Sequence, residues 1–332
     1  MRVGRRARWV SLIAVAALMA SCTAGSGASS SPGDTAWVAT DASVTLPGTA
    51  LTELDLSTGT VEGTVELGSL PSAMAFTPAG RALLVVTQGD DMLHQIDPRT
   101  GTVEHSVRVG VEPDAVAVAP GGTGNAGIAL VANRDSDSVT PVDLGTWRPG
   151  PPIEVGTEPV AVAVATAPGG VSGALVADFG SNEVTPITLS TMQAGTPIAV
   201  GPGPEAIAVA GGEALVANFG DRTLTPISLA TLTSGPAVAL PANPTGLAVA
   251  PSGATVYVSG GASVVPVTVA GLAVGAAISL PDAAQAIALD RAGTTAWVAL
   301  EAGDVVSVSL PSGVVSRPIR LGGHPSAIAI PG

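Results

Sequence analysis

Charged residues recur beside a repeated proline, and they are the side chains of this chain best suited to chemistry. The proline, replaced once by alanine, recurs at intervals of 40 to 46 residues. Carboxylates in such positions can bind hard cations such as Ca²⁺, and a histidine near a carboxylate can act as a general base. The residues directly before or after the repeated position that could do so are Glu112, Asp114, Glu158, Glu205 and His324.

A second set of polar residues ends short apolar segments of the same repeats. This set comprises Arg134, Asp178 and Asn218. We interpret both sets as candidate ligand-binding residues. The alternative is that they are solvated turn residues, because Asp, Asn and Gly are the residues that turns commonly use.

Catalysis has fewer candidates than binding. A general base could be formed by His324 together with Glu112 or Glu158, whereas His94 and His105 are expected at the surface of one repeat. The sequence contains no Gly-x-Ser-x-Gly elbow, His-Glu-x-x-His pair or phosphate-binding loop. The pattern therefore favours a binding role over an enzymatic one, and we expect no cofactor other than a divalent cation such as Ca²⁺.

The repeat itself predicts the architecture. Each unit contains four short segments with strand-like alternation, as in residues 206–210, 214–218, 224–229 and 238–240. The chain has 42 glycines and 28 prolines, a density of helix breakers that disfavours helical repeats. A β-solenoid would need shorter and more even units. A period near 40 residues is typical of four-stranded propeller blades. The seven repeated positions are Pro71, Pro113, Pro159, Pro204, Pro244, Ala284 and Pro325.

The two ends of the repeat region predict how the ring closes. The first unit has three strand-like segments, at residues 36–40, 51–56 and 63–67, with none before them. The last segment, at residues 327–330, has no others after it. We therefore predict an all-β domain over residues 34–332, a seven-bladed β-propeller of four-stranded antiparallel blades. The C-terminal strand joins the N-terminal blade and leaves no open sheet edge at the seam.

The first 33 residues have the pattern of an exported and anchored protein. Four arginines precede an apolar stretch from Trp9 to Ala20, which is shorter than the about 20 residues that span a bilayer. The following sequence, Leu18 to Cys22, resembles the lipobox of bacterial lipoproteins. This resemblance implies a signal peptide at residues 1–21, a lipid on Cys22 and a flexible linker at residues 22–33. The alternative is an unpaired thiol in an ordinary signal peptide.

Charge limits the partners that the predicted domain could bind. The chain has a formal net charge of −13 and no lysine. Without the four arginines before Cys22, nine basic residues face 26 acidic ones. Such a surface repels phosphate backbones, so we expect no nucleic-acid partner. We expect a monomer that is attached through Cys22 to the outer face of the cell membrane.

The second segments of several units carry a family resemblance. Residues 174–178 (ALVAD), 214–218 (ALVAN) and 255–259 (TVYVS) resemble the forty-residue YVTN-type repeat of bacterial propeller proteins. The resemblance covers about residues 34–332. It implies a propeller fold and an extracytoplasmic location. Relatives of this type include uncharacterised surface proteins, lactonase-like enzymes and some members implicated in DNA binding.

These expectations combine into one functional hypothesis and one alternative. The hypothesis is a membrane-anchored propeller lipoprotein that binds an envelope protein or a small ligand at the mouth of its central channel. The alternative, which follows from the lactonase-like relatives, is a hydrolase or lyase with its site at the same mouth.

Overall fold

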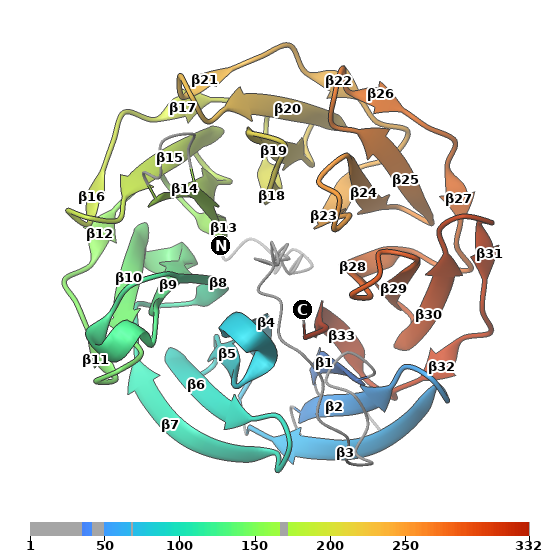
Figure 1. Cartoon of the computed structure of the whole chain (residues 1–332), viewed down its shortest axis with the longest axis horizontal. Helices are drawn as coiled ribbons and strands as arrows, with labels where there is room; N and C mark the ends of the chain where they lie inside the picture. Colours follow the sequence, from blue (N-terminus) through green and yellow to red (C-terminus); the bar gives the residue numbers. More distant parts are fainter. Residues whose placement is uncertain (1–34, 42–49, 68, 167–171, 332) are drawn as a thin grey trace, which may run out of the picture.

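The fold is a closed ring of seven β-sheets. A computed structural model describes residues 35–41, 50–67, 69–166 and 172–331. In it, seven antiparallel sheets stand around a central axis like the blades of a propeller (Figure 1). The predicted all-β, seven-bladed propeller is thereby confirmed. The helical segments of the described residues are three single turns, Pro78–Gly80, Thr123–Asn125 and Arg134–Ser136.

The predicted signal peptide, Cys22 and the linker up to residue 33 lie outside the described residues. Within the described ranges, no helix is long and apolar enough to cross a membrane.

Each blade is built from strands that follow one another from the channel outwards, except in blade 1. Blade 1 runs from the rim inwards as β3 (Thr60–Glu66), β2 (Ala50–Asp55), β1 (Thr35–Asp41) and β33 (His324–Ala329). Blade 2 runs outwards as β4 (Pro71–Phe76), β5 (Leu83–Thr87), β6 (Met92–Asp97) and β7 (Thr102–Arg108). In both blades the outer strand is continuous.

In the other five blades the outermost strand is divided into two short pieces. Blade 3 contains β8 (Pro113–Ala119), β9 (Ile128–Asn133), β10 (Ser138–Asp143), β11 (Arg148–Pro149) and β12 (Ile153–Glu154). Blade 4 contains β13 (Pro159–Thr166), β14 (Ser172–Asp178), β15 (Glu183–Thr188), β16 (Gln193–Ala194) and β17 (Ile198–Ala199). Blade 5 contains β18 (Pro204–Ala210), β19 (Glu213–Asn218), β20 (Thr223–Ser228), β21 (Thr233–Ser234) and β22 (Val238–Ala239).

Blades 6 and 7 repeat this arrangement. Blade 6 contains β23 (Pro244–Val249), β24 (Thr255–Gly260), β25 (Ser263–Thr268), β26 (Ala273–Val274) and β27 (Ile278–Ser279). Blade 7 contains β28 (Ala284–Leu289), β29 (Thr295–Leu300), β30 (Asp304–Ser309), β31 (Val314–Val315) and β32 (Ile319–Arg320). In each of the five blades, both outer pieces pair with the third strand.

In four of the five blades, the division of the outer strand lies opposite a proline in the third strand, at Pro141, Pro186, Pro226 or Pro266. Pro141 of β10 accepts a hydrogen bond at its carbonyl from Gly150 N–H, at 2.7 Å. The N–H and C=O groups of a strand residue point to the same side, so the donor that Pro141 lacks would face this gap between β11 and β12. Blade 7 has Ser307 at the equivalent place, and its N–H donates to Ser316 Oγ at 2.9 Å. In blade 7 the Ser316 side chain therefore accepts the hydrogen bond of the backbone N–H that proline lacks in the other four divided blades.

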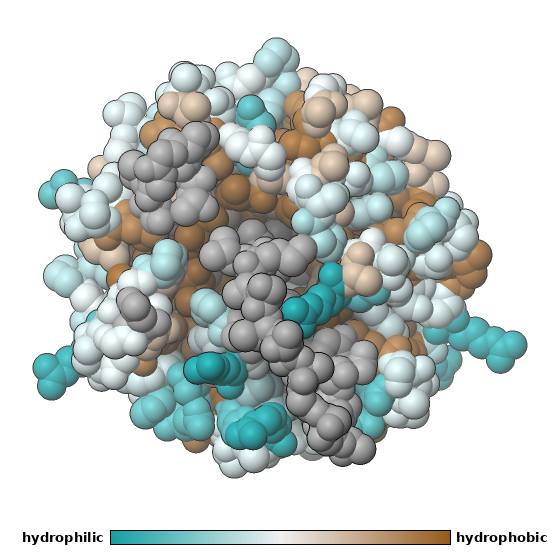
Figure 2. Space-filling model, viewed as in Figure 1, coloured by the Kyte–Doolittle hydropathy of each residue, from teal (hydrophilic) through white to brown (hydrophobic). Residues whose placement is uncertain are grey.

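The core lies between neighbouring blades and is made of small and branched side chains. Innermost strands alternate alanine with valine, isoleucine or leucine, as in β18, where Ala206, Ile207 and Ala208 are all at most 1% exposed. Small residues suit the crowded centre of the ring, and branched residues fill the space between sheets. On the face seen in Figure 2, polar residues cover most of the blade ends, and hydrophobic residues reach the surface in recesses between them.

Side-chain hydroxyls join the innermost strands of neighbouring blades. Ser72 Oγ donates to the carbonyl of Pro113 at 2.6 Å, and Thr245 Oγ1 donates to that of Ala284 at 2.9 Å. Ser326 Oγ donates in the same way to Pro71 at 2.7 Å, across the seam of the ring. All three hydroxyls belong to the residue directly after the repeated position, so in these blades the repeat places this residue at the contact with the next innermost strand.

The C-terminal strand closes the ring as predicted. β33 pairs antiparallel with β1, with Trp37 opposite Ala329 and Val38 opposite Ile328. It lies on the channel side of blade 1 and contacts the innermost strands of both neighbouring blades (Figure 1).

Removing β33 by truncation after Leu321 should abolish the single cooperative unfolding transition, because β1 would become an open edge and two blade interfaces would lose their inner strand. Thermal unfolding followed by far-ultraviolet circular dichroism measures this. The matched point variant Ser326→Ala leaves β33 in place and removes only its hydroxyl, which donates to Pro71 across the seam and more weakly to Ala39 within blade 1. It should cost about 1 kcal/mol. A truncated chain that melts at the parent temperature would show that the seam does not stabilise the ring.

Candidate functional site

The candidate site lies where two kinds of turn meet around one mouth of the channel. In blade 3, Arg134 N–H donates to the carbonyl of Glu112 at 2.9 Å. In blade 4, Phe179 N–H donates to the carbonyl of Glu158 at the same distance. These bonds join the turn after the second strand to the turn that enters the first strand. The two kinds of turn therefore lie side by side in blades 3 and 4.

The acidic turn residues are held in place by other acidic side chains. Glu112 and Glu158 have φ of 49° and 50°, a left-handed conformation that is uncommon for residues other than glycine. Asp91 Oδ1 accepts the Glu112 N–H at 3.1 Å, and Asp137 Oδ1 accepts the Glu158 N–H at 2.9 Å. The backbone of both glutamates is therefore fixed, which sets where their side chains begin.

An ion-pair cluster forms the centre of the site. Arg134 Nη2 lies 3.0 Å from Glu158 Oε2, and its Nη1 lies 3.7 Å from Asp114 Oδ2. Gln88 Nε2 donates to Asp114 Oδ1 at 2.6 Å, and the Arg134 guanidinium lies over the Phe179 ring at 5.8 Å. The cluster therefore draws side chains from three consecutive blades to one point of the rim.

Burial makes this cluster electrostatically unusual. Asp114 is fully buried, and burial raises the pKa of its carboxyl group to about 8, although Arg134 opposes the change. Burial alone would lower the pKa of Arg134, but Asp114, Glu158 and Glu205 outweigh it and raise that pKa. Glu205, on β18, is 5% exposed and also raises the pKa of Asp114. Protonation of Asp114 near neutral pH is thus coupled to the charge around it.

Asp114 and Glu205 occupy the same register position as the hydroxyls that join neighbouring blades. Each follows the repeated proline directly and begins an innermost strand. Between them in the ring stands Val160, which has no polar atom in its side chain. In blades 3 and 5, Asp114 and Glu205 therefore stand where other blades have a hydroxyl. Blade 4, between them, has the apolar Val160 at this position.

Asp178 and Asn218 do not face the mouth. Both are fully buried within their blades, opposite the repeated proline of the adjacent strand. Thr185 Oγ1 donates to Asp178 Oδ2 at 2.6 Å, and Asn218 Nδ2 donates to Thr225 Oγ1 at 2.8 Å. Asn133 makes the same bond in blade 3. These residues therefore join the second and third strands of a blade.

His324 is placed apart from the carboxylates with which it could form a general base. Its Nδ1 lies 3.2 Å from the carbonyl oxygen of Glu301, in blade 7. It opens β33 in blade 1, whereas Glu112 and Glu158 precede the inner strands of blades 3 and 4. Glu158 is thus almost opposite His324 across the ring.

Among the described residues, no group of three or more His, Cys, Asp or Glu side chains is arranged to hold a metal ion.

Two features of the site and its surroundings differ from the sequence interpretation. Gln88 was not among the candidate residues, although it follows the second strand of blade 2 as Arg134 follows that of blade 3. His94 is buried rather than at the surface, between Thr87 and Ser106, so that expectation was wrong. It occupies the third-strand position that threonine fills in blades 3 to 5, which explains its burial.

The fold and the rim cluster define a seven-bladed propeller with a charged channel mouth. No family model matches the sequence, and a comparison with curated proteins gives no match. Among solved structures, a functionally unknown protein from Desulfotomaculum acetoxidans has a TM-score of 0.76 and 17% identity, over 89% of this chain and 98% of that chain.

Two further solved structures are similar. A putative 6-phosphogluconolactonase from Bacteroides fragilis has a TM-score of 0.69 and 18% identity, over 89% of this chain and 97% of that chain. Kuenenia stuttgartiensis hydrazine synthase has a TM-score of 0.68 and 20% identity, over 77% of this chain and 88% of that chain. At these identities the likeness shows the propeller fold alone.

Asp178→Asn should stabilise the protein at alkaline pH. Burial raises the pKa of Asp178 to about 7, above its ordinary value of 3.8. The stabilising contribution of its protonated form is therefore complete below about pH 4 and is lost as pH rises towards 7. Asparagine rebuilds the bond that Asn133 and Asn218 make without a charge. The expected gain at pH 8 is about 2 kcal/mol, half of what the full pKa difference would give.

Urea unfolding at pH 5 and pH 8 measures this gain. The reciprocal variant Asn218→Asp should lose more stability at pH 8 than at pH 5. Equal effects of either substitution at the two pH values would contradict a buried carboxylate at this position.

Proposed function

We propose that this chain is an extracytoplasmic, membrane-anchored propeller that binds a positively charged group of a protein or small ligand at its channel mouth. The observation that carries the proposal is the rim cluster, in which Arg134 is surrounded by an excess of carboxylates. Those carboxylates are Glu112, Asp114, Glu158 and Glu205.

The charge balance of the cluster supports a cationic ligand. The Arg134 guanidinium compensates only part of the negative charge of the carboxylates. The negative charge that remains uncompensated attracts cations into the mouth. The side chain of Glu158 is 48% exposed and that of Arg134 is 26% exposed, so both can be reached by a ligand. Phe179 is partly buried beside them and offers a ring face to an aliphatic or cationic group.

Protonation of Asp114 would couple this binding to pH. With its pKa raised to about 8, Asp114 is largely protonated at neutral pH. A bound cation would favour the ionised carboxylate, so binding would release a proton below that pH. Affinity for a cation should therefore rise as pH increases towards 9.

The alternative function, a hydrolase or lyase, has less support. Its proposed base needs His324 near Glu112 or Glu158, and these residues belong to turns two and three blades away. The similarity to a putative 6-phosphogluconolactonase, at 18% identity, supports the shared fold and not a shared reaction.

Membrane attachment is the second part of the proposal. Its support is the sequence of residues 1–22, with four arginines, an apolar stretch and Cys22 as the only cysteine. A diacylglyceryl group on Cys22 would supply more than one buried acyl chain, which is enough for stable attachment. The channel mouth would then meet envelope proteins or small ligands outside the cytoplasmic membrane.

The rim should bind an arginine–glycine octapeptide labelled with fluorescein. Replacing Glu158 by Gln should weaken binding about three- to ten-fold, because the variant loses one exposed carboxylate. The matched control Glu62→Gln changes an exposed carboxylate on the outer strand β3 and should leave the affinity unchanged. Fluorescence anisotropy at pH 6.5 and pH 9 measures both effects, with tighter binding expected at pH 9. Equal affinities of the parent and both variants would mean that the peptide binds the acidic surface without using the rim.

The lipid on Cys22 can be tested separately. In a bacterial host that modifies lipoproteins, the parent should fractionate with membranes and carry a diacylglyceryl mass on Cys22. Cys22→Ala should lack this mass and appear in the soluble fraction. Intact mass spectrometry of both forms decides the question, and a parent chain without lipid would refute the anchor.

A further inference from the structure

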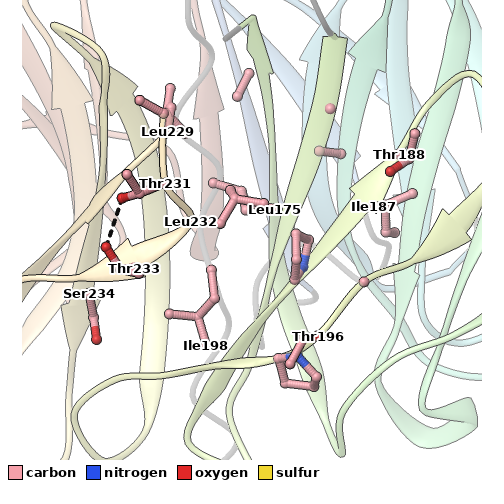
Figure 3. A pocket seen from close by; sticks show the side chains of 17 residues that line it. Leu175, Ile187, Thr188, Thr196, Ile198, Leu229, Thr231, Leu232, Thr233 and Ser234 are labelled. Atoms are coloured by element: carbon pink, nitrogen blue, oxygen red, sulfur yellow. Dashed lines mark hydrogen bonds between the residues drawn. The ribbon is translucent and has the colours of Figure 1, made fainter.

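A groove between blades 4 and 5 is separate from the channel mouth. It lies beside the turn that joins β20 to β21 and the end of β13, at the opposite end of the blades from the rim cluster. Its volume is about 710 Å³. Figure 3 shows Leu175, Ile198 and Leu232 with side chains directed into the space. This volume falls within the range of about 300–1,000 Å³ that small-molecule sites occupy.

One residue of the groove differs from its counterparts in the other blades. The turn between the third and fourth strands has a left-handed residue other than glycine in four blades, namely Trp147, Met192, Leu232 and Leu272, with φ between 49° and 55°. Trp147 stacks on His105 of blade 2, with ring centroids 4.9 Å apart. Met192 and Leu272 pack against hydrophobic clusters between blades. Leu232, in contrast, is 44% exposed at the edge of the groove.

The interface beneath the groove is made largely of small side chains. The cluster between blades 4 and 5 contains five alanines, including Ala163, Ala165 and Ala177, among its buried residues. Of these alanines, Ala165 lines the groove directly, next to Gly173 and Ala174 of the adjacent strand. These three residues place little side-chain volume at this side of the groove.

The chemistry of the lining is apolar at the floor and hydroxylic at the rim. Leu175, Ile187, Ile198 and Leu229 form a floor that is at most 7% exposed. The hydroxyl groups around it belong to Thr188, Thr196, Thr231, Thr233 and Ser234. Thr231 and Thr233 are hydrogen-bonded to each other at 2.8 Å (Figure 3). None of the described residues that line the groove carries a charge.

From this lining we infer that the groove binds an uncharged, mainly aliphatic molecule, of the class of a medium-chain fatty alcohol. An aliphatic chain would cover the apolar floor and the exposed part of Leu232, which is favourable because it removes apolar surface from water. The hydroxyl rim would hydrogen-bond a neutral head group. A carboxylate would gain no cation in the groove and would meet the negative field of an acidic protein.

The groove can be tested with the full chain carrying Cys22→Ser, which removes the acylation predicted at that residue. The probe is N-phenyl-1-naphthylamine, an uncharged dye that fluoresces in apolar sites, and 1-dodecanol and laurate are the competitors. We expect one saturable site, from which 1-dodecanol displaces the dye at least ten-fold better than laurate does.

Variants of exposed residues connect the signal to the groove. Leu232→Glu places a carboxylate at its edge and should weaken dye binding at least ten-fold. The matched control Val314→Glu changes a valine that is 64% exposed in blade 7, and it should bind the dye as the parent does. Equal binding by both variants, equal competition by laurate, or absence of a saturable site would each overturn the proposal. Binding of the arginine–glycine peptide is independent of this groove, so failure here leaves the rim proposal unaffected.

Discussion

The pairing of β33 with β1 is the constraint on which the rest of the structure depends. Each blade buries its faces only against its two neighbours, so the stability of every interface requires an unbroken ring. Because the innermost strand of blade 1 comes from the other end of the chain, the ring exists only when the whole domain has folded. The Ser326 hydroxyl, bonded to the carbonyl of Pro71, fixes this seam to blade 2. The channel mouth and its cluster are therefore a property of the closed ring.

The inner ring also shows how one structural position carries different side chains in different blades. The residue after the repeated position donates a hydroxyl to the next blade in blades 1, 2 and 6. In blades 3 and 5 the same position is Asp114 or Glu205, whose side chains have no proton to donate when they are ionised. Asp114 is instead paired with Arg134 and Gln88, and its ionised form is disfavoured by burial. In blade 3 a hydroxyl contact has been exchanged for a carboxyl group whose charge depends on pH near neutrality.

Repetition within one chain helps to separate structural polar residues from candidate functional ones. Asn133, Asp178 and Asn218 occupy equivalent positions and bond equivalent threonines, so their shared contacts explain their presence. The rim residues Gln88, Arg134 and Phe179 also occupy equivalent positions, but their chemistry differs in each blade. Their backbone contacts are the same, and only their side chains vary. Differences at equivalent positions therefore indicate where this propeller is specialised.

The number of blades, the order of strands within each blade and the closure by the C-terminal strand could all be predicted from the sequence. These follow from local patterns, because a period near 40 residues, turn-forming residues and alternating apolar segments each act within one unit. The candidate site was predictable only as a set of turns. Which side chains meet at the rim depends on the angle between blades, which no single unit specifies. Asp178 and Arg134 both lie near the end of a second strand, yet the first points into its blade and the second reaches Glu158 of the next one. The groove beside Leu232 likewise exists only through the packing of blade 4 against blade 5, because the volume of an interface depends on two surfaces together.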